Sequence, residues 1–172
     1  AFAERSNRGS PKETRVHPIV NIAVRAARRA GQIISRAADR IDELTIESKG
    51  HNDLVSEIDR QAEAAIIDTI RRAYPDHGIL GEESGALESD SEFTWIIDPL
   101  DGTTNYLRGI PHHCTSIGVR KGSVLQHGVI VDHLRNEEFS ATRGEGAQLN
   151  GKRIRATTTA KLENAIVTAG MP

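Results

Sequence analysis

Cysteine, aromatic side chains and long apolar runs are all scarce in this sequence of 172 residues. The one cysteine, Cys114, excludes an internal disulfide and predicts a protein of a reducing compartment. No apolar run approaches the roughly 18 residues that span a bilayer, and residues 1–15 contain no apolar signal core. The sequence therefore predicts a cytoplasmic protein with no membrane contact.

The low aromatic content, 3% of the chain, also bears on the basic side chains near the N-terminus. Clustered arginines can bind nucleic acid, but single-strand binders combine them with aromatic rings on which bases stack. No such aromatic surface accompanies Arg25, Arg28, Arg29 and Arg36. We interpret them as the solvated face of a helix.

Acidic residues, in contrast, are concentrated in the middle of the chain. The hydrophobic and charged fractions, 37% and 27%, are ordinary for a globular protein, and the length fits one domain or part of a larger one. Sixteen of the 24 Asp and Glu residues lie between residues 41 and 101. They form either a solvated acidic face or a set that converges on metal ions, because clustered like charges are costly unless a cation neutralises them.

Helical patterns follow a polar, aperiodic stretch at residues 1–16, which we expect to be a flexible extension. One helix is predicted from Pro18, and a second from near Ser56, its expected N-cap, to just before Pro75. The residues expected to face the core are Ile19, Ile22, Ala26, Ala30, Ile33 and Ala37 in the first helix and Ile58, Ala62, Ala65, Ile66 and Ile70 in the second.

Short apolar runs bounded by Gly, Pro, Asp or Asn come next, and each is typical of a strand. They lie at residues 78–80, 93–97, 115–119, 124–132 and 137–142, and Asn150-Gly151 marks a hairpin. Helices followed by a mostly antiparallel sheet predict the α+β class rather than repeated βαβ units.

The stretch WIIDPLDGTTNY, residues 95–106, combines an apolar strand, a bend and two aspartates. Pro99 lacks an N–H group and disfavours helix at Asp98, so we expect the strand to leave the sheet there. Asp98, Asp101 and the carbonyl of Leu100 then offer hard oxygen ligands on one bend. This donor set suits Mg²⁺, which keeps several waters and leaves positions open for a phosphate.

Polar residues on both sides of this bend could complete a site. Thr103 and Thr104 start a predicted helical turn whose hydroxyls could orient a water and whose N–H groups could hold a phosphate oxygen. An Asp-Gly turn with a threonine cap is the alternative. In GEESG, Glu82 and Glu83 follow a strand and point to opposite faces, so only one of them should enter a given site. An ordinary polar turn is the alternative there.

At these residues the chain resembles the inositol monophosphatase family of Mg²⁺-dependent, lithium-sensitive phosphatases, and most closely its bacterial SuhB-type members. The resemblance runs from about His17 to Pro172 and rests on four segments in family order: HPIVNIAVRAARRAGQIIS, KGHNDLVSEIDRQAEAAIIDTIRRAYPDHGILGEESG, WIIDPLDGTTNYLRGIPHHCTSIGVR and EEFSATRGEGAQLNGKRIRAT. It implies the layered α/β sandwich of these sugar phosphatases, with residues 17–172 as its N-terminal part. The C-terminal part, which supplies a further metal-binding aspartate and most contacts to the sugar ring, is expected to be absent from this chain.

The resemblance also implies a metal site and its ligands. Glu82, Asp98, the Leu100 carbonyl and Asp101 would bind two or three Mg²⁺ ions, with Asp98 as the bridge. Asp101 would also lie beside the substrate. Inhibition by Li⁺ is expected of such a site.

Further residues receive catalytic roles from the same resemblance. Thr103, together with the glutamate ligand, would hold the nucleophilic water. Gly102 and Thr104 would supply backbone N–H groups to the phosphate, and Lys49 and Asp59 would lie close to the metal. For Asp59, the alternative is that it completes the cap of the second helix.

The implied reaction is direct attack of a metal-activated water on inositol-1-phosphate or a similar small phosphate monoester. No covalent phosphoenzyme is needed, so Cys114 is interpreted as a small buried residue at the start of a strand. The alternatives are a sister activity on fructose bisphosphate or 3′-phosphoadenosine nucleotides, and a transcription-antitermination partner of RNA polymerase and Nus factors. A homodimer is implied too, and severely reduced activity is expected of the isolated chain.

Overall fold

The computed structural model describes residues 17–41 and 48–168, with side chains for residues 17–38 and 57–168. The expected extension at residues 1–16 and the side chain of Lys49 lie outside the described residues. Two long helices come first, α1 (Pro18–Ile41) and α2 (Ser48–Ala73). The remaining elements are β1 (Gly78–Gly81), β2 (Gly85–Leu87), β3 (Phe93–Asp101), α3 (Thr103–Leu107), β4 (Cys114–Lys121), β5 (Val124–Asp132), β6 (Glu137–Thr142), β7 (Gly146–Leu149), β8 (Lys152–Ile154) and the 3₁₀ turn η2 (Leu162–Asn164).

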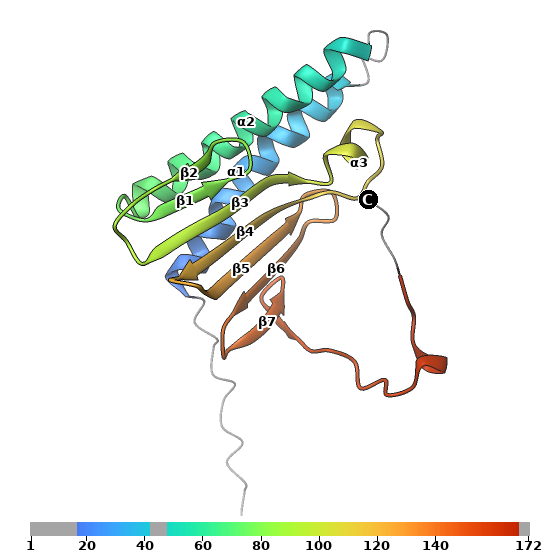
Figure 1. The fold of residues 1–172 in the computed structure, drawn as a ribbon. Coiled ribbons are helices and arrows are strands. Elements are labelled where there is room, and N and C mark those ends of the chain that lie inside the picture. The colour runs from blue at the N-terminus through green and yellow to red at the C-terminus, as the bar shows by residue number, and fades with distance from the viewer. Residues whose placement is uncertain (1–16, 42–47, 169–172) are drawn as a thin grey trace, which may run out of the picture.

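The described strands form an eight-stranded sheet in the order β2-β1-β3-β4-β5-β6-β7-β8. Within it, β1 and β3 pair in parallel and every other neighbouring pair is antiparallel. Figure 1 shows α1 and α2 side by side on one face, with α1 against β4 and β5 and α2 against β3. The predicted α+β class is confirmed, and Asn150-Gly151 joins β7 to β8 as a hairpin.

Helix α1 begins at Pro18 as predicted, but its buried surface differs from the predicted stripe. His17 caps the helix, because its Nδ1 atom accepts the N–H of Ile19 at 3.2 Å. Expected core residues that are only partly buried are Ile22, Ile33 and Ala37, whereas Val20, Ala23, Ala27 and Ile34 are buried. The helix packs against both α2 and the sheet, so a broader surface than one stripe loses contact with solvent.

Helix α2 begins at Ser48, so the predicted start near Ser56 is wrong. Gly50 and Asn52 are weak helix formers that cost about 1 kcal/mol or less each. No proline lies between residues 48 and 56 to stop the backbone, and the helix continues through them. Its end before Pro75 is confirmed, and so is the burial of its expected core residues Ile58, Ala62, Ala65, Ile66 and Ile70.

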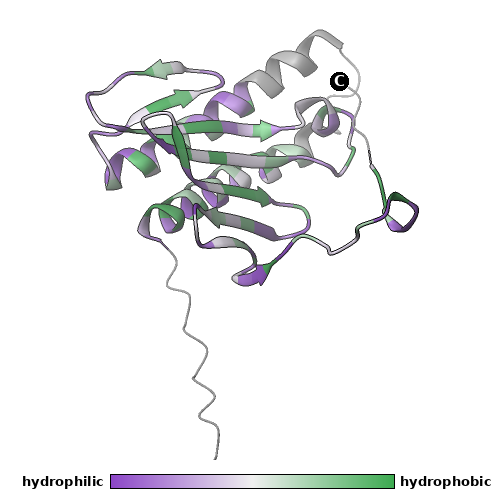
Figure 2. Cartoon of the chain, turned by 60° about the horizontal axis from the view of Figure 1, so that its bottom comes forward, coloured by the Kyte–Doolittle hydropathy of each residue, from purple (hydrophilic) through white to green (hydrophobic). Residues whose placement is uncertain are grey.

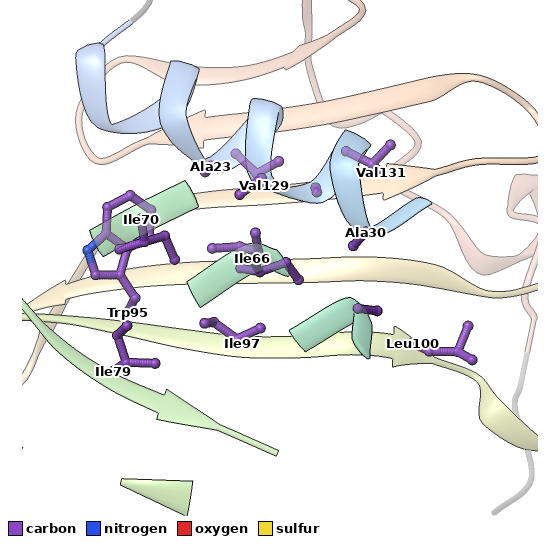
Figure 3. Packing of buried hydrophobic residues seen from close by; sticks show 14 of the residues in the cluster. Ala23, Ala30, Ile66, Ile70, Ile79, Trp95, Ile97, Leu100, Val129 and Val131 are labelled. Carbon is purple, nitrogen blue, oxygen red and sulfur yellow. The ribbon is translucent and has the colours of Figure 1, made fainter. Parts of the chain in front are cut away.

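The hydrophobic core lies between the two helices and the sheet. Figure 3 shows Trp95 and Ile97 of β3 and Val129 of β5 with Ile66 of α2 in this layer. Trp95 is fully buried, and its indole Nε1 donates to Nδ1 of His77 at 3.0 Å, so its polar atom is satisfied. Green and purple alternate along the strands and helices in Figure 2, as expected where one face of each element is buried.

The opposite face of the sheet carries Leu80, Ile96 and Ile130, which are 41%, 39% and 44% exposed. Among the described elements, no helix covers this face. None of the described helices combines the length and the apolar character needed to cross a membrane.

Candidate functional site

The parallel pair β1 and β3 brings two acidic segments to the same edge of the sheet. Gly81 pairs with Ile97, so Glu82, which follows β1, lies beside Asp98 of β3. The backbone N–H of Glu82 donates to the carbonyl of Ile97 at 3.2 Å and extends the pairing by one step. The acidic residues after β1 and those near the end of β3 are therefore spatial neighbours.

The end of β3 is a bulge rather than an exit from the sheet. The predicted departure at Asp98 is wrong, because β3 continues to Asp101. Asp98 pairs with Ser116 and Asp101 with Cys114, which leaves Pro99 and Leu100 opposite one residue of β4. A bulge tolerates proline because its residues do not all donate to the ladder.

The hydroxyl of Thr115, the residue of β4 opposite the bulge, donates to the Pro99 carbonyl at 2.8 Å and fixes the bulge. Because the register shifts between Asp98 and Asp101, their side chains do not follow the alternation of a regular strand.

Helix α3 follows the bulge directly, as the sequence predicts. Gly102 adopts φ of 95°, in the left-handed region, and a Cβ atom there would lie 2.9 Å from the His112 carbonyl oxygen. Thr103 makes no side-chain cap, and its hydroxyl donates instead to the Leu100 carbonyl at 2.9 Å. The Leu100 oxygen therefore keeps one lone pair for a further partner.

Asp59 enters the same region from α2. It is buried, and its Oδ1 atom has no hydrogen-bond partner. Burial raises its pKa to about 7, and the carboxyl groups of Glu83, Glu82, Asp98 and Glu63 add to the shift. The capping alternative for Asp59 is wrong, because α2 begins at Ser48 and Asp59 lies in its interior.

Asp98 has an environment like that of Asp59. Its Oδ1 atom is also buried without a partner. Burial is the largest cause that raises its pKa to about 7. Repulsion from Glu82, a hydrogen bond between protonated Asp98 and Glu82, and repulsion from Asp101 raise the pKa further. Mutual repulsion of clustered carboxylates is the condition that a bound cation relieves.

The donor set fits a hydrated hard cation. In the part of the chain that the structure describes, no three His, Cys, Asp or Glu side chains gather closely enough to enclose an ion by themselves. Mg²⁺ does not require such a cage, since it usually keeps several waters and takes one or two carboxylates. Partnerless buried oxygens on Asp59 and Asp98, next to the carboxyl group of Glu82, provide that chemistry.

The other predicted residues lie at the margin of this cluster or beyond the described side chains. Asp101 and Thr104 are exposed, and Lys49 has no described side chain. Cys114 starts β4 but is only partly buried, with Sγ 3.8 Å from Oδ2 of Asp101. Burial and, to a smaller extent, the negative charge of Asp101 raise the pKa of the Cys114 thiol to about 11. Cys114 is therefore not an activated nucleophile.

Glu63 is the residue of this region that sequence reasoning missed. It is 2% exposed on α2, and its Oε2 and Oε1 atoms accept the backbone N–H groups of Glu83 at 2.9 Å and Ser84 at 2.8 Å. Its spacing was an available signal, since Glu63 lies one helical turn after Asp59 and between the buried residues Ala62 and Ile66.

Residues 15–172 match the inositol monophosphatase family. The Nus factor SuhB of Escherichia coli K12 is 50% identical over 158 residues, which cover 91% of this chain and 59% of that protein. Two solved structures have similar folds. The extragenic suppressor protein SuhB of Bartonella henselae has a TM-score of 0.75 at 36% identity, over 86% of this chain and 58% of that one. An inositol monophosphatase from Anabaena has a TM-score of 0.70 at 37% identity, over 83% and 51%. This chain thus spans between half and three-fifths of the length of these relatives.

Proposed function

Because the chain belongs to the inositol monophosphatase family, we propose that it is the part of a Mg²⁺-dependent phosphatase that holds the metal and the attacking water. The proposed substrate is inositol-1-phosphate or a similar small phosphate monoester. The observation that carries the proposal is the meeting of Asp59, Glu82 and Asp98 at one edge of the sheet, with two buried oxygens that lack partners.

Four groups would hold two or three Mg²⁺ ions: the carboxylates of Glu82, Asp98 and Asp101 and the carbonyl of Leu100. Bound Mg²⁺ would neutralise the phosphate, lower the pKa of the attacking water and stabilise the leaving alkoxide. Li⁺ inhibition belongs to the same proposal.

The chain's own residues would orient the reactants. The Thr103 hydroxyl, held by the Leu100 carbonyl, would position the water, and Glu82 would accept its proton. The N–H groups of Gly102 and Thr104 would bind phosphate oxygens, since N–H groups in the first turn of a helix lack intrahelical partners. Lys49 and Asp59 would support this arrangement from α2.

Substrate choice and full activity belong to a longer protein in this proposal, because the chain spans 59% of the Escherichia coli relative. We expect the 172-residue chain to bind Mg²⁺ but to hydrolyse inositol-1-phosphate slowly. Fructose bisphosphate and 3′-phosphoadenosine nucleotides are the competing substrates, and parallel assays of phosphate release on all three would rank them.

Calorimetry with Mg²⁺ and inorganic phosphate tests the site directly. The wild-type chain should take up Mg²⁺, and Asp98→Asn should abolish the uptake. Glu57→Gln is the matched control, since Glu57 is an exposed acid on α2 and bonds only to Arg60 and Gln61 among the described residues. A wild-type chain that is folded and takes up no divalent cation contradicts the proposal.

A second candidate function is association with the transcription machinery. The observation that favours it is the 50% identity with a protein named Nus factor SuhB. Purified chain should then retain RNA polymerase or Nus proteins on an affinity column, and Asp98→Asn should leave that retention unchanged if binding and hydrolysis are separate. Homodimer formation and a cytoplasmic location stay predictions.

A further inference from the structure

Glu63 presents an arrangement that the proposed catalytic roles do not use. A buried carboxylate needs partners for its oxygens. The carboxylate of Glu63 finds them in two consecutive backbone N–H groups, of Glu83 and Ser84, rather than in a basic side chain. Among the described residues, no salt bridge involves Glu63. Its negative charge is therefore committed to the backbone of one turn.

That turn carries the predicted ligand Glu82. Three successive N–H groups are fixed there, and they are bound from two directions. The N–H of Glu82 donates to Ile97 of β3, and the next two N–H groups donate to Glu63 of α2. The backbone on which the Glu82 carboxyl group stands is thus held between the sheet and the helix.

Close packing on the other side confines the Glu63 carboxyl group further. A Cβ atom on Gly81, the last residue of β1, would lie 2.6 Å from the Cδ and both oxygen atoms of Glu63. A Cβ atom at this position would have to displace the carboxylate. The carboxylate therefore lies against Gly81, at the junction of β1 with the turn.

The chemical identity of the side chain matters as much as its place. Glutamine would fill the same space but offers one acceptor oxygen and one NH₂ donor. Two N–H groups require two acceptors, so a glutamine would leave one N–H facing another donor. The need for two acceptors explains why a charged residue is buried here.

We propose that Glu63 is a positioning residue that holds the Glu82–Ser84 turn and thereby sets the affinity of the site for divalent cations. This inference rests on the proposed function, because it assumes that Glu82 is a ligand. Helix α2 would then serve the site twice, through Asp59 at its edge and through Glu63 beneath the turn.

The test compares Glu63→Gln with wild type by Mg²⁺ and Mn²⁺ calorimetry. Loss of residues that orient metal ligands typically weakens metal binding by about 10- to 100-fold, and we expect Glu63→Gln to weaken it at least tenfold. Glu57→Gln, on the exposed face of the same helix, should bind as wild type does. Ile70→Val, a core change on α2 away from the turn, controls for general loss of stability.

Amide hydrogen exchange supplies a readout that needs no metal. In Glu63→Gln, the N–H groups of Glu83 and Ser84 should exchange faster. In Ile70→Val, their exchange should change no more than that of the N–H groups in α2. If Glu63→Gln fails to fold, Glu63→Asp replaces it, because the shorter side chain keeps the charge but cannot reach both N–H groups.

The outcomes separate the two proposals. Equal cation affinity of wild type and Glu63→Gln, with wild type binding normally, overturns the positioning role alone. Unchanged exchange at Glu83 and Ser84 also overturns it. A wild-type chain that binds no cation overturns the proposed function, and the inference falls with it.

Discussion

Replacing Asp98 with asparagine should stabilise the metal-free protein while removing its affinity for Mg²⁺. In the folded chain, burial and the neighbouring carboxyl groups of Glu82 and Asp101 raise the pKa of Asp98 from 3.8 to about 7. A group with a raised pKa binds more protons in the folded state than in the unfolded state between those two values. The contribution of Asp98 to stability therefore falls as the pH rises from about 4 to about 7 and stays at its lower value above that range.

The magnitude follows from the same shift. At 1.36 kcal/mol per pKa unit, a change of this size corresponds to about 4 kcal/mol. Asp98 is only partly buried, so solvent screening reduces this figure to about 1–2 kcal/mol. For a chain of this length we expect the Tm of Asp98→Asn to exceed that of wild type by roughly 2–8 °C near pH 8.

Thermal unfolding in EDTA near pH 8 and near pH 4 is the assay. The two proteins should differ near pH 8 and differ much less near pH 4, where Asp98 is protonated in the folded state and partly protonated in the unfolded state. Added Mg²⁺ should then stabilise wild type, by about 1.4 kcal/mol at ten times its Kd, and leave Asp98→Asn unchanged. An Asp98→Asn variant less stable than wild type in EDTA near pH 8 would refute the inferred repulsion. Asp90→Asn, at an exposed site, is the control.

Three further substitutions test the packing around the site by urea denaturation. Gly102→Ala should cost about 2 kcal/mol or more, because φ of 95° is strained for alanine and the new Cβ would lie 2.9 Å from the His112 carbonyl oxygen. Gly31→Ala should cost about 1–3 kcal/mol, because its Cβ would lie 2.1 Å from Nδ1 of His133, whose Nε2 lies 2.8 Å from the Thr115 hydroxyl. Burial lowers the pKa of His133 to about 4, so the contribution of His133 to stability should be lost as the pH falls from about 6.5 to about 4, opposite in sign to that of Asp98. His133→Asn should lose about 1 kcal/mol less over that range, after allowance for partial exposure.

Matched glycine and alanine controls separate strain from contact. Gly122 has φ of 57° and no atom within 4 Å of an added Cβ, so Gly122→Ala measures the backbone strain without the clash. If it destabilises as much as Gly102→Ala, the close approach to His112 contributes nothing. Ser35→Ala, at an exposed site of α1, should not reproduce the loss in Gly31→Ala. A His133→Asn protein with the pH dependence of wild type contradicts the titration argument.

The elements that sequence predicted well are those specified by local patterns. The start of α1, the end of α2 and the buried residues of α2 follow from periodicity and proline positions, and the structure confirms them. The start of α2 was missed because Ser56 looked like an N-cap, and a local cap signal cannot reveal a helix that continues through weak helix formers.

In contrast, a local sequence pattern does not show which strands pair with one another. The runs GIL and FTWII read as strands in either direction, so nothing in them predicted that β1 and β3 run parallel, with β2 added on the outer edge. That pairing is what brings Glu82 beside Asp98. The bulge at Pro99 was missed for a related reason, since proline alone permits either an exit from the sheet or a bulge.

Glu63 shows most clearly why part of the site escaped prediction. Its helical position belongs to the buried face, where periodicity leads one to expect an apolar residue, and its partners Glu83 and Ser84 are 20 and 21 residues away. A charged residue on a buried helical face contradicts the local pattern. Such contradictions are expected at functional sites, where a residue is kept although its burial costs stability.

The acids of α2 also explain how stability and site geometry depend on each other. Asp59 and Glu63 are buried one helical turn apart. Because burial separates their carboxyl groups from bulk water, the oxygens need a backbone N–H group or a cation as a partner. The apolar contacts of Ile66 and Ile70 further along the same helix hold them in place and offset their desolvation. Only Glu63 has its oxygens satisfied within the chain, whereas Asp59 keeps one without a partner. The unsatisfied member of the pair is therefore the one that a bound cation would stabilise, and the satisfied member is the one that would keep the turn in register while the cation is absent.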